Sequence, residues 1–153
     1  MSIEKAISLC YFFLKFRPRT EAEIIRYLER KSLRFHFSNE IIHATVTQLK
    51  QGGFINDEKF VKMYVANRNL LKPRGSFLLK RELSHLGIQK NLIEEYFSQN
   101  KTDETKTAID LLKRRESLKR LDEKIRFKKA ISYLLRKGFT YDIAKKAYSA
   151  SYY

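Results

Sequence analysis

The stretch GGFINDEKFVKMYVANRNLLKPRGSFLLKRELSHLGI, residues 52–88, indicates how the whole chain folds. Within it, and on to residue 97, apolar residues recur every three or four positions, which is the period of one face of an α-helix. Gly75 and Gly87 interrupt these runs, and glycine adopts left-handed backbone angles without a steric cost. We therefore expect three short helices in series, with turns or helix ends at these two glycines.

The same pattern continues towards both ends of the chain. Three helices are predicted before the central stretch: residues 3–16, a segment from Thr20 to a basic and aromatic connector at 31–37, and 38–51. Three more are predicted after it, marked by apolar residues within 108–118, 127–134 and 143–148. Only five glycines and two prolines occur in 153 residues, which also favours helices over sheets.

Several polar residues are placed to start these helices. Thr20 and Glu23 have the spacing of a capping box, in which each side chain accepts a hydrogen bond from the other residue's backbone. Ser38 is the expected cap of the third helix, and Asn56 or Asp57 that of the fourth. Asp103 precedes the seventh helix, where a negative charge is favourable.

Internal similarity indicates repeats. Leu83–Ile88 aligns with Leu134–Phe139 at an offset of 51 residues, and Leu92 then aligns with Ile143. One such unit buries too little apolar surface to be stable alone, so neighbouring units must pack together. We predict an all-α fold of about nine helices in three tandem three-helix repeats, elongated in shape, with boundaries at 1–56, 57–100 and 101–153.

The net charge indicates an acidic partner. Lys and Arg number 32 against 17 Asp and Glu, a formal charge of +15, which is typical of proteins that bind nucleic acid or an anionic surface. Residues 1–56 carry 9 basic and 5 acidic side chains (+4), residues 57–100 carry 8 and 5 (+3), and residues 101–153 carry 15 and 7 (+8). More than half of the excess therefore lies in the last third.

Two groups of cations are candidate binding residues for phosphates or for an acidic protein groove. The first surrounds the central turn and consists of Arg68, Lys72, Arg74, Lys80 and Arg81. The second recurs at helical spacing in the last third and consists of Lys113, Arg114, Arg115, Lys119, Arg120, Lys124, Arg126, Lys128 and Lys129. The alternative is a solvated surface with weak internal pairs to nearby acids such as Glu116, Asp122 and Glu123.

Other site types find little support. Tyr11, Phe12, Phe35 and Phe37 could stack on bases if exposed, but aromatic residues at helical spacing are usually core. The three histidines are far apart, the single Cys10 gives no zinc spacing, and no phosphate-loop or dinucleotide motif occurs. We expect no catalytic, cofactor-binding or metal-binding residues, and therefore not an enzyme.

One cysteine excludes an intramolecular disulfide and fits a reducing compartment, so a cytoplasmic location is expected. The apolar run Ile7–Leu14 is too short to span a membrane and lacks the flanks of a signal peptide, so no membrane partner is expected.

Four motifs in order carry a resemblance to a known family. The chain reads GFINDEKF at 53–60 with Tyr64 and Arg68 following, then KPRG at 72–75, then ELSHLGI at 82–88, and RKGF at 136–139. In this order and spacing it resembles the RecX family of recombinase regulators. The resemblance covers nearly the whole chain, and no single motif is specific alone.

The resemblance implies a curved, elongated molecule of tandem three-helix repeats. It also implies a monomer that lies along the groove of the RecA filament on single-stranded DNA. There it inhibits filament extension, ATPase activity and strand exchange in recombination and repair, as part of the SOS response, and double-stranded DNA is a further expected partner. The residues alone leave two alternatives: a basic helical protein that binds DNA without RecA, and a helical scaffold for another acidic protein.

Overall fold

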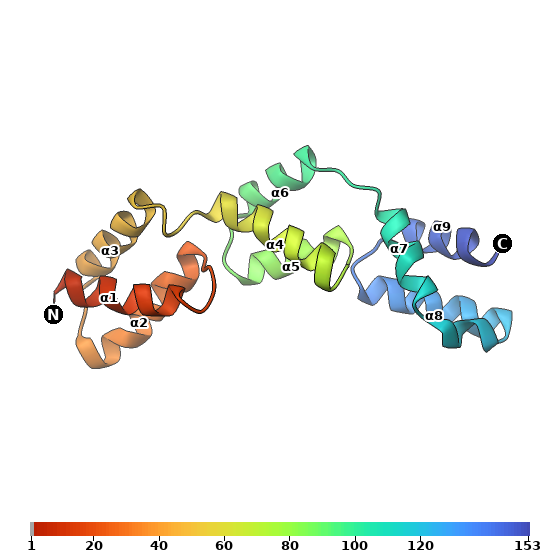
Figure 1. Ribbon diagram of the computed structural model, residues 1–153, viewed down its shortest axis with the longest axis horizontal. Coiled ribbons are helices and arrows are strands. Elements are labelled where there is room, and N and C mark those ends of the chain that lie inside the picture. Colours follow the sequence, from red (N-terminus) through yellow and green to blue (C-terminus); the bar gives the residue numbers. More distant parts are fainter. Residues whose placement is uncertain (1) are drawn as a thin grey trace. The chain divides into compact units, whose positions relative to one another are not determined.

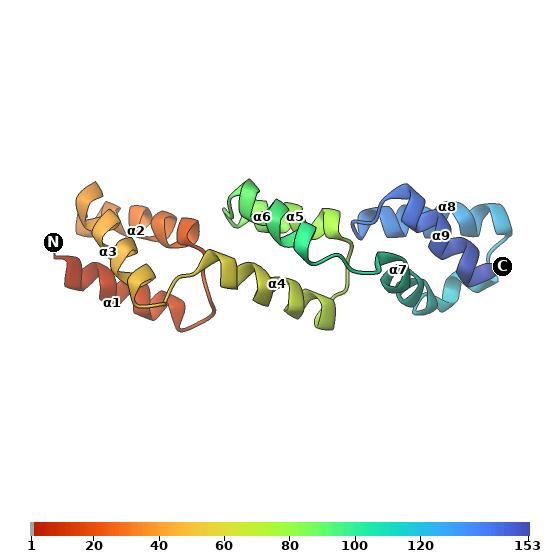
Figure 2. The same ribbon diagram turned by 90° about the horizontal axis from the view of Figure 1, so that it is seen from above.

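The computed structural model describes residues 2–153, and over this range the chain is all-α, with nine α-helices and one short 3-10 helix (Figures 1 and 2). The tandem three-helix fold predicted from the sequence is confirmed. No helix in the described range is long and apolar enough to cross a membrane. The helices are α1 (Ile3–Leu14), α2 (Glu21–Phe35), α3 (Asn39–Gln51), α4 (Asp57–Leu71), α5 (Ser76–His85), α6 (Lys90–Gln99), α7 (Glu104–Lys113), η1 (Glu116–Arg120), α8 (Glu123–Arg136) and α9 (Tyr141–Tyr152).

The chain forms two compact units. The first runs to Met63 and takes in Leu83–Ile93, and the second consists of Tyr64–Glu82 and Glu94–Tyr153. Helices α4, α5 and α6 therefore each contribute to both units. The repeat boundaries at 56/57 and 100/101 stay a prediction.

The core of the first unit is built by α1, α2 and α3, which pack on one another. Its fully buried members include Ile24, Leu28 and Leu49, with 1 % or less of each side chain exposed. Cys10 is fully buried in the same cluster, and burial raises the pKa of its thiol to about 12. Cys10 is therefore a small apolar core residue at neutral pH.

The predicted caps of the first unit form. The Thr20 Oγ1 accepts from the Glu23 backbone N–H at 3.1 Å while the Glu23 carboxylate accepts from the Thr20 N–H at 3.1 Å, a complete capping box. Ser38 caps α3 by accepting from the Ile41 N–H at 3.2 Å. Asn56 caps the start of α4 by accepting from the Lys59 N–H at 3.0 Å.

Asp57, the alternative cap considered from the sequence, has a different partner. Its carboxylate accepts a hydrogen bond of 2.9 Å from the backbone N–H of Glu21, at the start of α2. Burial raises the pKa of Asp57, and the hydrogen bond from Glu21 lowers it in part. Asp57 therefore satisfies a free amide of another helix, 36 residues away.

The expected connector at 31–37 is mostly helix. Helix α2 continues to Phe35 and ends at His36, whose φ of 55° is left-handed and whose N–H donates to the Ser32 carbonyl at 2.8 Å. Basic and aromatic residues alone do not stop a helix, since lysine, arginine and leucine are good helix formers. The helix ends only where the backbone turns left-handed.

The second unit has its own core, to which α7, α8 and α9 contribute most. The prediction of a continuous seventh helix through Leu118 is wrong, because α7 ends at Lys113 and Leu118 is buried from the separate η1 helix. A continuous helix would place Leu118 about 240° around the axis from Leu112, at about 100° per residue. The break lets both leucines face one core.

The motif glycines allow close approach of chain segments. Gly87 has φ 87°, as predicted, and a Cβ there would lie 2.2 Å from the Ala22 Cβ. Gly75 does not have the left-handed angle expected of it. Its N–H donates to the Lys137 carbonyl at 2.7 Å, and a Cβ on it would lie 2.2 Å from the Gly138 carbonyl oxygen. The KPRG and RKGF motifs thus meet backbone to backbone.

Candidate interaction surface

The first group of candidate cations divides into paired and unpaired side chains. Lys80 lies 3.6 Å from the Glu94 carboxylate and sits over the Phe97 ring, 5.4 Å from its centroid. Arg68 is half-buried over the Tyr64 ring, and a hydrogen bond with Tyr64 raises the pKa of its guanidinium. Lys72 and Arg81 are exposed and make no ion pair among the described residues.

Arg74 is largely occupied within the second unit. Its Nη1 donates to the Glu82 carboxylate and its Nε to the Lys72 carbonyl at 3.0 Å. Only 12 % of the Arg74 side chain and 22 % of the Glu82 side chain are exposed, so this ion pair is mostly shielded from water. An arginine held in this way stabilises the turn at residues 72–75 rather than presenting a free charge.

The second group is also mixed. Arg115 lies over the Tyr133 ring at 4.5 Å, and Lys119 pairs with Glu116 at 3.3 Å on the exposed surface. Arg126 is half-buried: its Nε donates to the Tyr148 hydroxyl at 3.2 Å and its guanidinium lies over the Tyr152 ring at 4.7 Å. These three cations serve local contacts, although Lys119 remains largely exposed.

The remaining six cations of the second group are free of ion pairs among residues 2–153. All are exposed, and none makes an ion pair in the described part of the chain: Lys113, Arg114, Arg120, Lys124, Lys128 and Lys129. Lys124 and Lys128 are four residues apart on α8 and so share one face of that helix. We call these six residues the basic surface of the second unit.

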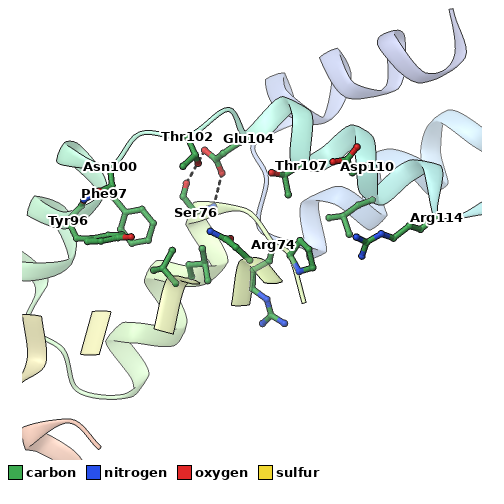
Figure 3. Close-up of a pocket in the computed structure, with 15 residues that line it drawn as sticks. Arg74, Ser76, Tyr96, Phe97, Asn100, Thr102, Glu104, Thr107, Asp110 and Arg114 are labelled. Atoms are coloured by element: carbon green, nitrogen blue, oxygen red, sulfur yellow. Dashed lines mark hydrogen bonds between the residues drawn. The ribbon is translucent and has the colours of Figure 1, made fainter. Parts of the chain in front are cut away.

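A cavity of about 330 Å³ opens beside this surface and is lined from α4 to α7 (Figure 3). Glu104 closes one side: its carboxylate accepts from the Ser76 N–H at 2.7 Å and from the Ser76 hydroxyl at 3.1 Å, so it caps the start of α5. Dashed lines mark this contact in Figure 3, where the Arg74 side chain points away from Glu104. Arg114 lines the cavity together with Asp110.

Both acidic and basic side chains line the cavity. Its most buried carboxylate, that of Glu104, already accepts a hydrogen bond from the Ser76 N–H. Among residues 2–153 no group of three His, Cys, Asp or Glu side chains could hold a metal ion. The Glu104–Ser76 contact at this cavity holds the start of α5 against α7. Charges available to a partner are those of the basic surface together with exposed cations elsewhere, such as Lys72 and Arg81.

Sequence reasoning missed three contacts. They are the Glu104 cap on α5, the Glu82 partner of Arg74, and the approach of Gly75 to Gly138. Each joins residues at least eight positions apart, so helical periodicity carries no signal for it. The repeat offset of 51 could have drawn attention to the glycines, because it pairs Gly87 with Gly138 and so predicts that both serve the same purpose.

Comparison with known proteins agrees with this architecture. The RecX third three-helix domain matches residues 102–148. The crystal structure of RecX from Lactobacillus salivarius superposes with a TM-score of 0.84 at 24% identity, covering 97% of this chain and 96% of that one, which shows the shared fold.

Two sequence relatives extend the comparison. A regulatory protein RecX from Chlorobium phaeobacteroides is 31% identical over 136 residues, covering 89% of this chain and 86% of the relative. One from Streptococcus sanguinis is 34% identical over 143 residues, or 92% of this chain, but this chain spans only 53% of that relative's length. On this identity and coverage, and with the shared fold, the chain belongs to the RecX family of regulatory proteins.

Proposed function

We propose that this chain binds the RecA recombinase filament on single-stranded DNA and inhibits its ATPase activity, filament extension and strand exchange. Membership of a family of regulatory proteins supports a non-catalytic role. The observation that carries the proposal is the basic surface, six exposed cations on the second unit without internal partners. A filament of protein and DNA presents repeated phosphates and carboxylates to such a surface.

The structure refines the candidate residues. We assign filament or DNA contact to the basic surface and to Lys72, Arg81 and the largely exposed Lys119, whose pair with Glu116 is weak because it lies in water. Arg68, Arg74, Lys80, Arg115 and Arg126 are assigned to internal support of their surroundings, because each has a close ring or carboxylate partner.

The test is a titration of this chain into RecA on single-stranded DNA, with ATP hydrolysis as the readout at two salt concentrations. We expect inhibition below one chain per RecA protomer, because a chain that stops filament growth affects many protomers. The inhibition should weaken at the higher salt, because exposed charge pairs are screened. No change in hydrolysis across the titration would refute the proposal.

A charge-reversal pair gives the residue-level test. Lys124→Glu with Lys128→Glu should weaken inhibition, because both side chains are exposed and unpaired on one face of α8. The matched control is Lys145→Glu with Lys146→Glu, which makes the same change in net charge on exposed residues of α9. Equal effects of the two variants would mean that overall charge matters and the assigned positions do not.

The second candidate function is direct DNA binding without RecA, which the same unpaired cations favour. It predicts that affinity for DNA alone falls steeply with salt, in proportion to the number of phosphates contacted. A fluorescence anisotropy titration of a labelled oligonucleotide without RecA measures this. A flat salt response would remove this candidate and leave the first in place.

A further inference from the structure

The first unit carries a hollow that the function proposed above does not use. It has a volume of about 630 Å³ and lies where the end of α1, the 53–56 connection and the start of α4 meet, with Leu14, Lys15, Phe16, Phe54 and Lys59 among its lining residues. A second hollow of about 450 Å³ shares Leu14, Lys15 and Phe54 with it and extends to Tyr11. The two hollows are therefore one continuous surface.

Three exposed aromatic rings line this surface, those of Tyr11, Phe16 and Phe54, and a fourth, Phe12, lies beside it in contact with Phe16. The exposed fractions are 44% for Tyr11, 60% for Phe12, 68% for Phe16 and 53% for Phe54. The rings form two pairs: Tyr11 and Phe54 have centroids 4.9 Å apart, and Phe12 meets Phe16 edge to face at 5.2 Å. Exposed phenylalanine rings gathered in one place mark a binding surface, since scattered single apolar residues need no explanation but a cluster does.

The charged residues among those described as lining the larger hollow are all cations, namely Lys15, Arg17, Arg19 and Lys59. Arg17 and Arg19 both pair with Glu23, whereas Lys15 and Lys59 are exposed and make no ion pair within residues 2–153. The surface thus offers ring faces for stacking and two free ammonium groups for an anion.

We propose that this aromatic surface, formed by Tyr11, Phe12, Phe16 and Phe54 with Lys15 and Lys59, binds single-stranded nucleic acid directly. Unpaired bases stack on the exposed rings, and the phosphates between them contact the two lysines. Aromatic platforms within a positive groove are the usual means by which proteins hold single strands without reading their sequence. The site lies on the first unit, acts without RecA, and is separate from the basic surface of the second unit.

The combination of exposed rings with free lysines favours a nucleic acid over a protein helix. A single strand carries a phosphate beside every base, so it can contact the rings and both Lys15 and Lys59 at once. The apolar face of an amphipathic helix would contact the rings and leave the two lysines without an anion. A duplex is also disfavoured, because its bases are already stacked on one another and only a single strand presents free base faces.

The chain contains no tryptophan, which gives a direct experiment on the whole chain. Phe16→Trp places one indole in the surface, and stacking of a base on it quenches its fluorescence. The matched control is Phe77→Trp, because Phe77 on α5 is similarly exposed at 61% but belongs to the second unit and lines neither hollow. The probes are a 15-nucleotide thymidine oligonucleotide, its uridine RNA counterpart, and a DNA duplex of equal length.

We expect saturable quenching of Phe16→Trp by both single strands, weak quenching by the duplex, and little quenching of Phe77→Trp by any probe. In anisotropy titrations without RecA, Phe16→Ala should weaken thymidine oligonucleotide binding by about 5- to 150-fold, the loss of one base stack. Phe16→Leu should weaken it too, because it keeps apolar contact and removes the ring, while Phe77→Ala should not.

Circular dichroism spectra confirm that each variant is folded before binding is measured. Equal quenching of the two tryptophan variants, or thymidine oligonucleotide binding unaffected by both Phe16→Ala and Phe16→Leu, would overturn the proposal. Full binding by Phe16→Leu with loss in Phe16→Ala would also overturn it, because apolar contact, and not stacking of a base on the ring, would then hold the strand. Since RecA is absent, failure here leaves the proposed inhibition of the filament to its own titration.

Discussion

The aromatic surface of the first unit and the rings beside the core of the second unit meet cations differently, although each unit contains rings covered by its own cations. Beside the second core, Arg115 lies over Tyr133 at 4.5 Å and Arg126 lies over Tyr152 at 4.7 Å. In the first unit, Phe12 and Phe16 are exposed and neither has a cation over its ring in the described part of the chain. A covered ring supports its own unit, whereas an exposed ring is available to a partner.

The difference shows why net charge alone locates no surface. The second unit has most of the excess positive charge, yet several of its arginines are committed to rings or to Glu82. The first unit has fewer cations, but its exposed rings surround two unpaired lysines. Whether a charge is free depends on tertiary contacts, and the Arg74 and Tyr133 variants described below test this contrast directly.

The largest expected effect is on the free energy of unfolding and concerns the buried leucines that both units contain. Leu28 in the first unit and Leu134 in the second are both fully buried. Leu28→Ala and Leu134→Ala should each lower the free energy of unfolding by about 2 to 5 kcal/mol, through lost burial and the cavity left behind. Urea denaturation followed by circular dichroism measures this. A loss below about 1 kcal/mol in either variant would contradict the core assigned to that unit.

The next prediction compares the loss of stability on replacing Arg74, which is paired with Glu82, with the loss on replacing Arg81, which is exposed and unpaired. Arg74→Met leaves the largely buried Glu82 carboxylate without its partner and should cost about 1 to 3 kcal/mol of stability. Arg81→Met, at an exposed unpaired neighbour, should change stability by no more than about 0.5 kcal/mol. Adding Glu82→Leu to Arg74→Met should recover part of the loss, because the unpaired charge is then removed.

Much of the fold could be predicted from the sequence because its determinants are local. The capping box at Thr20 and Glu23, the Ser38 cap and the helical faces of α4 and α5 each depend on residues within four positions of one another. The end of α7 could not be predicted in this way, because it depends on tertiary packing. Leu118 is buried in the second core only because the helix breaks before it.

For the candidate surface, the sequence predicts which cations are present but not which of them are free to contact a partner. Spacing identified fourteen cations, but whether each is free depends on partners such as Glu82 and Tyr133, which lie 8 and 18 residues from Arg74 and Arg115. The aromatic residues show the same limit. Tyr11 and Phe12 are exposed, whereas Phe37, in the same candidate set, is buried in the first core.

A smaller effect tests the two uses of rings directly. Tyr133→Leu removes the ring beneath Arg115 and should lower stability by about 0.5 to 1 kcal/mol without changing oligonucleotide affinity. Phe16→Leu should do the reverse, lowering oligonucleotide affinity with little loss of stability, because Phe16 is 68% exposed. Denaturation and anisotropy on both variants give the comparison. If both lose only stability, the contrast between the units fails.

The smallest effect concerns Asp57, whose carboxylate accepts from the Glu21 N–H within the first unit. Burial raises the pKa of Asp57 above its ordinary value of 3.8, so the folded state holds the proton more tightly than the unfolded chain. Stability from this group is therefore present below the ordinary value and is lost as pH rises through the raised pKa.

Asp57→Asn keeps an acceptor for the Glu21 N–H but has no charge to bury. The variant should gain stability relative to the native chain as pH rises from about 4 to about 7, measured by urea denaturation at each pH. A relative stability that falls over this range would mean that the charged carboxylate, with its hydrogen bond, is favoured in the fold.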